Sequence, residues 1–216
     1  MVNLMTGELP VNEGTITFGG RDITALDAGA RTHLGMARSF QMLRLFRSLS
    51  VEDNLVMACH FRMKSGMVAN ILRSPASREE ERELRARARE LLGWFELGDF
   101  ADRPVSAMSI GQQRMVELAR GILAQPKLFV LDEPAAGLSP VNVDRLITLI
   151  RRMRDEFGMS ILLVEHDMRV VRELCDHVTV LDTGRVIANG EPLEVVNSPA
   201  VVEAYIGTGW KRRAEA

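Results

Sequence analysis

The 216-residue chain has few of the residues that mark several common classes of protein. It has two cysteines, Cys59 and Cys175, with no Cys-x-x-Cys spacing, which argues against a disulfide framework and a zinc site. Aromatic residues make up 5%, too few for a surface on which nucleic-acid bases stack. No apolar run is long enough to cross a bilayer, and the first residues lack the pattern of a signal peptide.

The charges of the chain nearly balance. Lys and Arg total 27 and Asp and Glu total 29, and the net charge of -2 argues against a nucleic-acid partner held by bulk charge. Hydrophobic residues make up 46%, enough to bury a core. We therefore expect a soluble, cytoplasmic α/β protein without a nucleic-acid partner, built as one domain or as one domain with an inserted subdomain.

Two short runs, residues 128–131 and 161–164, are apolar throughout. Such runs predict strands that are covered on both faces of a parallel sheet. A helical pattern separates them, with Ser139 placed to cap its start and Gly158 placed to end it. Strand, helix and strand in this order predict a βαβ unit with a right-handed crossover.

The remaining segments complete an α/β fold. Alternating polar and apolar residues at 15–18 and 177–182, each followed by a tight turn, predict two antiparallel hairpins. Residues 51–108 have a mostly helical pattern. Within them, residues 77–92 are dense in Glu and Arg, which predicts a helix whose charged face contacts water.

Two adjacent carboxylates, Asp132 and Glu133, follow the first apolar run. Ligands of open α/β sheets bind beyond the carboxyl ends of the strands, so these side chains are expected to face a cleft. One carboxylate can hold Mg²⁺ while the other polarises an attacking water. His166 follows the second run and is expected at the same edge of the sheet. Taken singly, each of these residues also fits an ordinary solvated strand end.

Ser109, Gly111 and Gln112 stand at the start of an amphipathic helical pattern. A helix N-terminus offers backbone N–H groups and the positive end of the helix dipole, which together with a hydroxyl can bind an anion. Many ordinary helices also begin with Ser-x-Gly, so this pattern alone is a weak indication. Gln41, after the expected strand at residues 36–40, is weaker still in isolation.

Together, the order and spacing of these motifs resemble the ATP-binding subunits of ABC transporters. Residues 40–41 are similar to the Q-loop, residues 109–113 to the signature, and residues 128–133 to Walker B with the catalytic glutamate. Residues 139–142 are similar to the D-loop, and His166 to the switch histidine. Four segments are similar to the branched-chain amino acid importer subunits in particular: residues 38–46, 60–83, 132–138 and 203–209.

The resemblance implies a P-loop NTPase (RecA-like) fold: a parallel sheet core, a short antiparallel portion and an inserted helical subdomain. Residues 1–50 would be the remainder of the nucleotide-binding core, residues 51–108 the helical subdomain, and residues 109–216 the signature helix and the C-terminal core. The partners it implies are a second ATP-binding subunit, as homodimer or heterodimer, and transmembrane permease subunits. The expected location is peripheral, on the cytoplasmic face of the membrane.

The resemblance also implies roles for the site residues, with ATP and Mg²⁺ as cofactors. Asp132 and Gln41 would coordinate Mg²⁺, Glu133 would activate water, and His166 would contact the γ-phosphate. Two subunits would enclose two ATP molecules head to tail, each presenting its signature residues to the nucleotide of the other. The further nucleotide-binding residues that the resemblance implies are Ser109, Gly111 and Gln112.

A Walker A motif, Gly-x-x-x-x-Gly-Lys-Ser/Thr, does not occur in the 216 residues. The backbone N–H groups and the lysine of that motif cradle phosphates, and the three lysines (Lys64, Lys127 and Lys211) have no such context. Residues 2–7 resemble the helix that follows a P-loop. The resemblance therefore implies an N-terminally truncated fold that lacks one strand and leaves its neighbours with unpaired edges.

Several interpretations stay open. The chain can be an incomplete version of an importer ATPase, a non-hydrolysing subunit that completes a partner's ATP site in trans, or an ABC-type ATPase of repair or translation. Leucine-type amino acids are the first expectation for the solute, and urea or other amides the second.

Overall fold

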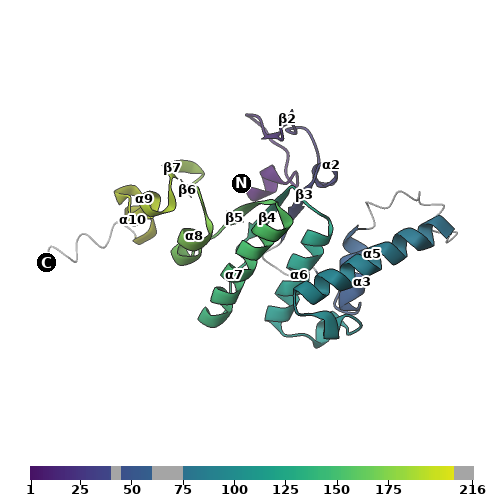
Figure 1. Cartoon of the computed structure of the whole chain (residues 1–216). Coiled ribbons are helices and arrows are strands. Elements are labelled where there is room, and N and C mark those ends of the chain that lie inside the picture. Colours follow the sequence, from purple (N-terminus) through teal and green to yellow (C-terminus); the bar gives the residue numbers. More distant parts are fainter. Residues whose placement is uncertain (40–44, 60–74, 207–216) are drawn as a thin grey trace.

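The computed structural model describes residues 1–39, 45–59 and 75–206 of the chain (Figure 1). Its helices are α1 (Val2–Met5), α2 (Ala28–His33), α3 (Val51–Cys59), α5 (Pro75–Trp94), α6 (Ile110–Leu123), α7 (Pro140–Phe157), α8 (Met168–Leu174), α9 (Pro192–Val196) and α10 (Pro199–Ile206). Its strands are β1 (Thr17–Phe18), β2 (Arg21–Asp22), β3 (Met36–Arg38), β4 (Leu128–Asp132), β5 (Ser160–Val164), β6 (Val178–Asp182) and β7 (Arg185–Gly190). No described helix is both long and apolar enough to cross a membrane.

The central sheet has the strand order β3-β4-β5, and both pairings are parallel. Helix α7 connects β4 to β5, which confirms the predicted βαβ unit. The hairpins β1–β2 and β6–β7 are antiparallel, as predicted, and form two separate two-stranded sheets. The described part of the chain therefore has the α/β organisation expected from the sequence.

Burial differs between the two apolar strands. The prediction that both are covered on both faces is correct for β4, in which residues 129–131 are fully buried, and wrong for β5, in which residues 161–164 are only half-buried. Among the described strands β5 pairs with β4 alone and β6 with β7 alone. The second edge of β5 thus has no ladder partner there, which accounts for its lower burial.

Helix α7 begins and ends where the sequence predicts. Pro140 occupies the first turn, where a missing N–H group loses no hydrogen bond, and Gly158 ends the helix in a left-handed conformation with φ of 62°. Ser139 stands at the N-cap, but its side chain makes no capping hydrogen bond. The predicted apolar face is buried: Val143, Leu146, Ile147, Ile150 and Met153.

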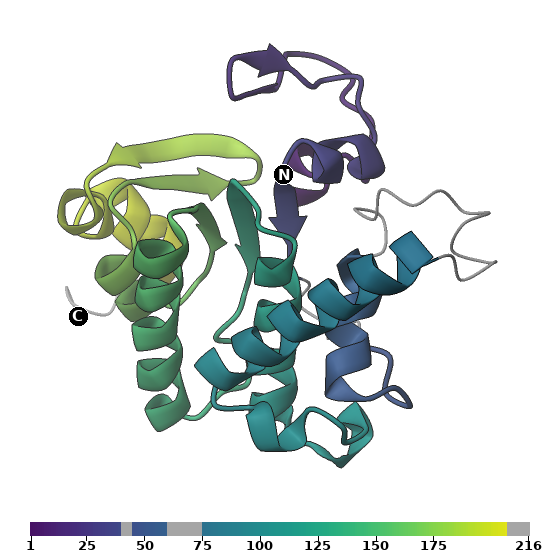
Figure 2. The same cartoon turned by 45° about the vertical axis from the view of Figure 1, so that its right-hand side comes forward.

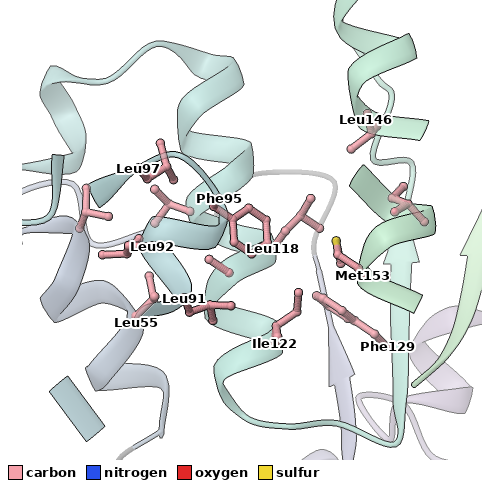
Figure 3. Close-up of a cluster of buried hydrophobic side chains, with 14 of the residues drawn as sticks. Leu55, Leu91, Leu92, Phe95, Leu97, Leu118, Ile122, Phe129, Leu146 and Met153 are labelled. Carbon is pink, nitrogen blue, oxygen red and sulfur yellow. The ribbon is translucent and has the colours of Figure 1, made fainter. Parts of the chain in front are cut away.

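One hydrophobic core extends from the helices of residues 51–108 to the central sheet (Figure 3). Leu55 of α3 and Leu92 of α5 contribute at one end, and Phe129 of β4 and Met153 of α7 at the other. Helix α6 lies between them and contributes Leu118, among others. Figure 2 shows α6 behind α5, with α7 beside it. The division of the chain into three parts stays a prediction.

Aromatic and charged side chains join α5 to α7 at the surface. The indole N–H of Trp94 donates a hydrogen bond to the carboxylate of Glu156, and the guanidinium of Arg152 lies 4.4 Å from the Trp94 ring centroid. Phe157 packs edge-on against the same indole, with 5.1 Å between the ring centroids. These contacts fix the last turn of α5 against the last turns of α7.

Helix α6 packs against Phe129 of β4 at Gly121. A Cβ atom added to this glycine would lie 2.2 Å from the ring of the buried Phe129. Real Cβ atoms do not come so near to another heavy atom, so the absence of a side chain lets the helix pack directly on the sheet.

We therefore expect Gly121→Ala to lower the free energy of unfolding by about 1–3 kcal/mol, because the extra methyl group forces the Phe129 ring or α6 to shift. Gly93→Ala is the matched control, since a Cβ at that helical position meets nothing within 4 Å. It should be neutral or stabilising by up to about 1 kcal/mol. Urea unfolding of both variants compares them, and equal stability would contradict the close approach.

Candidate functional site

The carboxyl ends of β4 and β5 meet at one edge of the sheet. The parallel register places Asp132 opposite Val164, the last residue of each strand. The N–H of Glu133 donates to the Val164 carbonyl at 2.9 Å, which extends the pairing one residue beyond β4. The side chains that follow both strands are thereby brought to the same edge, as the sequence predicts.

Glu133 and His166 face each other across this edge. Glu133 Oε1 lies 3.8 Å from His166 Nδ1, and the two side chains are 31% and 67% exposed. Glu133 is one of few described residues other than glycine with positive φ, at 47°. Such a backbone costs about 1 kcal/mol or more and persists where the surroundings enforce it, commonly at functional sites. The carboxylate and the imidazole are therefore held together and open to a ligand.

The side chain of Glu165 connects the loop after β4 with the loop after β5. Its side chain is 1% exposed. One carboxylate oxygen accepts the N–H of Ala135 at 2.9 Å, and the other accepts the N–H of His166 at 3.2 Å. One buried carboxylate thus ties the loop after Glu133 to the loop that carries His166. Breaking these hydrogen bonds would leave buried polar groups without partners and lower the stability of the fold. Glu165 therefore stabilises the spacing between Glu133 and His166.

Asp132 forms hydrogen bonds with a residue of strand β3 and with the residue directly after this strand. The guanidinium of Arg38 donates to Asp132 Oδ2 at 2.8 Å, and the hydroxyl of the buried Ser39 accepts the N–H of Asp132 at 3.3 Å. The Asp132 side chain is 19% exposed. The carboxylate is therefore fixed in direction and already faces a positive charge.

The donor set at this edge suits Mg²⁺ bound together with phosphates. In the described part of the chain, no three His, Cys, Asp or Glu side chains form a cluster that could hold a metal ion. Mg²⁺ at phosphate sites is held by one or two carboxylates, with waters and phosphate oxygens completing its shell. Asp132 alone can supply such a carboxylate. Gln41, the second predicted ligand, lies outside the described residues.

The start of α6 forms a capping box. The hydroxyl of Ser109 accepts the N–H of Gln112 at 3.3 Å, and the side-chain oxygen of Gln112 accepts the N–H of Ser109 at 3.0 Å. The hydroxyl keeps its own proton for a further acceptor. Gly111 follows in the first turn and would leave room beside the N–H groups. The predicted anion site is thus a well-ordered helix start, and its ligand stays a prediction.

The structure brings together Asp132, Glu133 and His166. The role of Ser109, Gly111 and Gln112 at the other subunit's nucleotide stays a prediction. Sequence reasoning gave no role to Arg38, Ser39 or Glu165. A charged residue inside a short strand was the available signal for Arg38, and an acidic residue directly before His166 was the signal for Glu165.

Comparison with protein families agrees with this geometry. Residues 1–136 match the family model described as ABC transporter, and residues 185–211 match a model described as branched-chain amino acid ATP-binding cassette transporter. The chain belongs to the ABC transporter family, among its ATP-binding proteins. The family implies binding of a nucleotide.

Among curated relatives, the chain is similar to a high-affinity branched-chain amino acid transport ATP-binding protein, BraF, of Pseudomonas aeruginosa. The two are 36% identical over 205 residues, which cover 95% of this chain and 80% of the relative. Its identity to the corresponding protein of Escherichia coli, LivG, is 37%, with the same coverage of both chains.

Solved structures show the same fold. An ATP-binding cassette of an ABC transporter in its ADP conformation superposes with a TM-score of 0.80 at 30% identity, covering 95% of this chain and 82% of that one. A nucleotide-free cassette gives a TM-score of 0.79 at 29% identity, with the same coverage. The α/β fold predicted from the sequence, that of an ABC-type P-loop NTPase, is therefore confirmed.

We expect Glu165→Gln to destabilise the chain by about 1–3 kcal/mol, because the amide replaces one buried acceptor oxygen with a donor that faces N–H groups. Amide exchange at Ala135 and His166 should accelerate with it. Glu173→Gln, which removes a half-exposed carboxylate on α8, is the control and should change stability by less than about 1 kcal/mol. Equal effects of the two substitutions would refute the bracing role of Glu165.

Proposed function

We propose that the chain is the ATP-binding subunit of an ABC importer that takes up branched-chain amino acids. The observation that carries the proposal is the joint placement of Asp132, Glu133 and His166 at one sheet edge. It is supported by relatives named for branched-chain amino acid transport that align along 95% of the chain. Urea or other amides are the second expectation for the solute. The residues of an ATP-binding subunit do not select between the two, because this subunit does not contact the solute.

The strand-end residues divide the chemistry of phosphate transfer between them. Asp132, with Gln41, would hold the Mg²⁺ that neutralises the phosphate charge of bound ATP. Glu133 would orient the attacking water and accept its proton, since its carboxylate is fixed yet exposed. His166 would donate a hydrogen bond to the γ-phosphate from its position 3.8 Å from Glu133. Glu165 would keep these two side chains at that spacing.

The α6 start would act on the nucleotide of a second ATP-binding subunit. Ser109, Gly111 and Gln112 would offer a hydroxyl and the N-terminal end of a helix to its phosphates. The complete importer would add transmembrane permease subunits. It would hold this chain peripherally on the cytoplasmic face of the membrane.

The phosphate cradle itself is not in the 216 residues, since they contain no Walker A motif. Under the proposal it comes either from further N-terminal residues of the same polypeptide or from the partner subunit. In the second case the chain would not hydrolyse ATP alone and would complete the partner's site in trans.

The mass of the intact protein made in its own cells decides between these sources. We expect a mass several kilodaltons above 24.1 kDa, with an N-terminal sequence that contains Gly-x-x-x-x-Gly-Lys-Ser/Thr. Tight binding of Mg²⁺ and ATP by that protein should follow. A mass of 24.1 kDa, with no ATP binding in the presence or absence of a partner, would overturn the proposed function.

The role in trans has its own test. Ser109→Arg should lower the ATPase rate of the assembled complex by at least about tenfold, because a bulky cation replaces a hydroxyl at the nucleotide contact. Ser106→Arg, at an exposed position just before α6, is the matched control and should leave the rate unchanged. A Ser109→Arg complex as active as the control would exclude the trans contact.

A further inference from the structure

Arg38 connects Asp132 to the start of the chain. One guanidinium nitrogen, Nη2, donates to Asp132 Oδ2 at 2.8 Å, and the other, Nη1, lies 3.1 Å from Glu8 Oε2. The Arg38 side chain is 11% exposed. Charge-assisted hydrogen bonds of this kind are about twice as strong as neutral ones and are little screened when buried. A single cation thus serves two carboxylates far apart in sequence.

The N-terminal segment, residues 2–9, depends on polar contacts for its order. Arg38 Nη1 also donates to Asn3 Oδ1 at 2.7 Å and to Thr6 Oγ1 at 3.1 Å. Helix α1, which lies in this segment, has only four residues, and none of them is buried. Arg31 supplies a second anchor through the carbonyls of Leu4 and Met5. Loss of the Arg38 contacts would therefore loosen the segment without unfolding the protein.

Arg38 also has room to change partners. It lines a cavity of about 260 Å³ whose wall also includes Glu8, Glu117, Arg31 and Arg120. A guanidinium released by Asp132 would meet in that wall two carboxylates, of which Glu117 already pairs with Arg114, and two further guanidinium groups. Arg38 would have to loosen its hold on Oδ2 when that carboxylate takes a divalent cation, since like charges repel at such short range.

We propose that Arg38 is a positioning residue that couples the charge state of Asp132 to the order of the N-terminal segment. When no metal ion is bound to it, the Asp132 carboxylate holds Arg38 and keeps the segment ordered. Asp132 engaged by Mg²⁺ frees Arg38 and loosens the segment. The last step rests on the proposed function, because it requires Asp132 to be the Mg²⁺ ligand.

Hydrogen exchange of the 216-residue chain tests the coupling without nucleotide. The reporters are the hydrogen-bonded amides of residues 4–9. Asp132→Asn removes the charge and keeps the shape, so these amides should exchange about tenfold faster, the loss of one charge-assisted bond. Glu133→Gln is the matched control: it neutralises the adjacent carboxylate and should leave the same amides unchanged. Amides within α7 serve as the reference for global stability in every variant.

A double substitution tests whether Arg38 is the residue that couples Asp132 to the N-terminal segment. Arg38→Met should accelerate exchange of the segment at least as much as Asp132→Asn does. The double variant should show the same exchange rates as Arg38→Met alone, because Arg38→Met already removes the interaction between Asp132 and the segment. Glu8→Gln cuts the other end of the link and should give a similar acceleration, so the result does not depend on one variant folding.

Two results would overturn the coupling: unchanged exchange of the segment in Asp132→Asn, or effects of Arg38→Met and Asp132→Asn that simply add. Addition of Mg²⁺ and ATP to the intact, unsubstituted protein together with its phosphate cradle reports on the proposed function instead, and faster exchange of the segment is expected. No change on that addition, beside a positive result for Asp132→Asn, would count against Asp132 as the Mg²⁺ ligand and leave the coupling intact.

Discussion

The parallel pairing of β4 with β5 is the constraint on which the rest of the site depends. Because Asp132 stands opposite Val164, the residues that follow each strand reach solvent at the same level. A shift of one residue would turn the side chains of one strand to the other face and separate Glu133 from His166. Helix α7, buried along one face against the sheet, holds this register by fixing the path between the strands.

Charge is arranged at this edge so that each carboxylate has a different neighbourhood. Asp132 faces a guanidinium, Glu133 faces an imidazole, and Glu165 is enclosed by backbone N–H groups. Three carboxylates gathered at one edge of the sheet would otherwise repel one another. Their separate partners let the edge carry a concentration of negative charge while keeping each side chain in a defined direction.

Patterns local in sequence could be predicted, and pairings distant in sequence could not. The apolar run before Asp132 and the Pro140 and Gly158 boundaries follow from residue chemistry over a few positions, so the βαβ unit was predictable. The half-burial of β5 was not, because strand order at a sheet edge leaves no mark within the strand itself. The Arg38–Asp132 bond joins residues 94 positions apart, which no periodicity reveals. Gln41 lies outside the described residues, so its predicted role gains no support here.

The contacts of Trp94 with Glu156, Arg152 and Phe157 have a spectroscopic consequence. The indole stands between a hydrogen-bonded carboxylate and a stacked cation, at the junction of α5 and α7. The other tryptophan, Trp210, is near the C-terminal end of the sequence. Any rotation of α5 relative to α7 would change the polarity around Trp94, and its fluorescence would shift in wavelength. The chain therefore carries a built-in optical reporter of the angle between its helical part and its sheet.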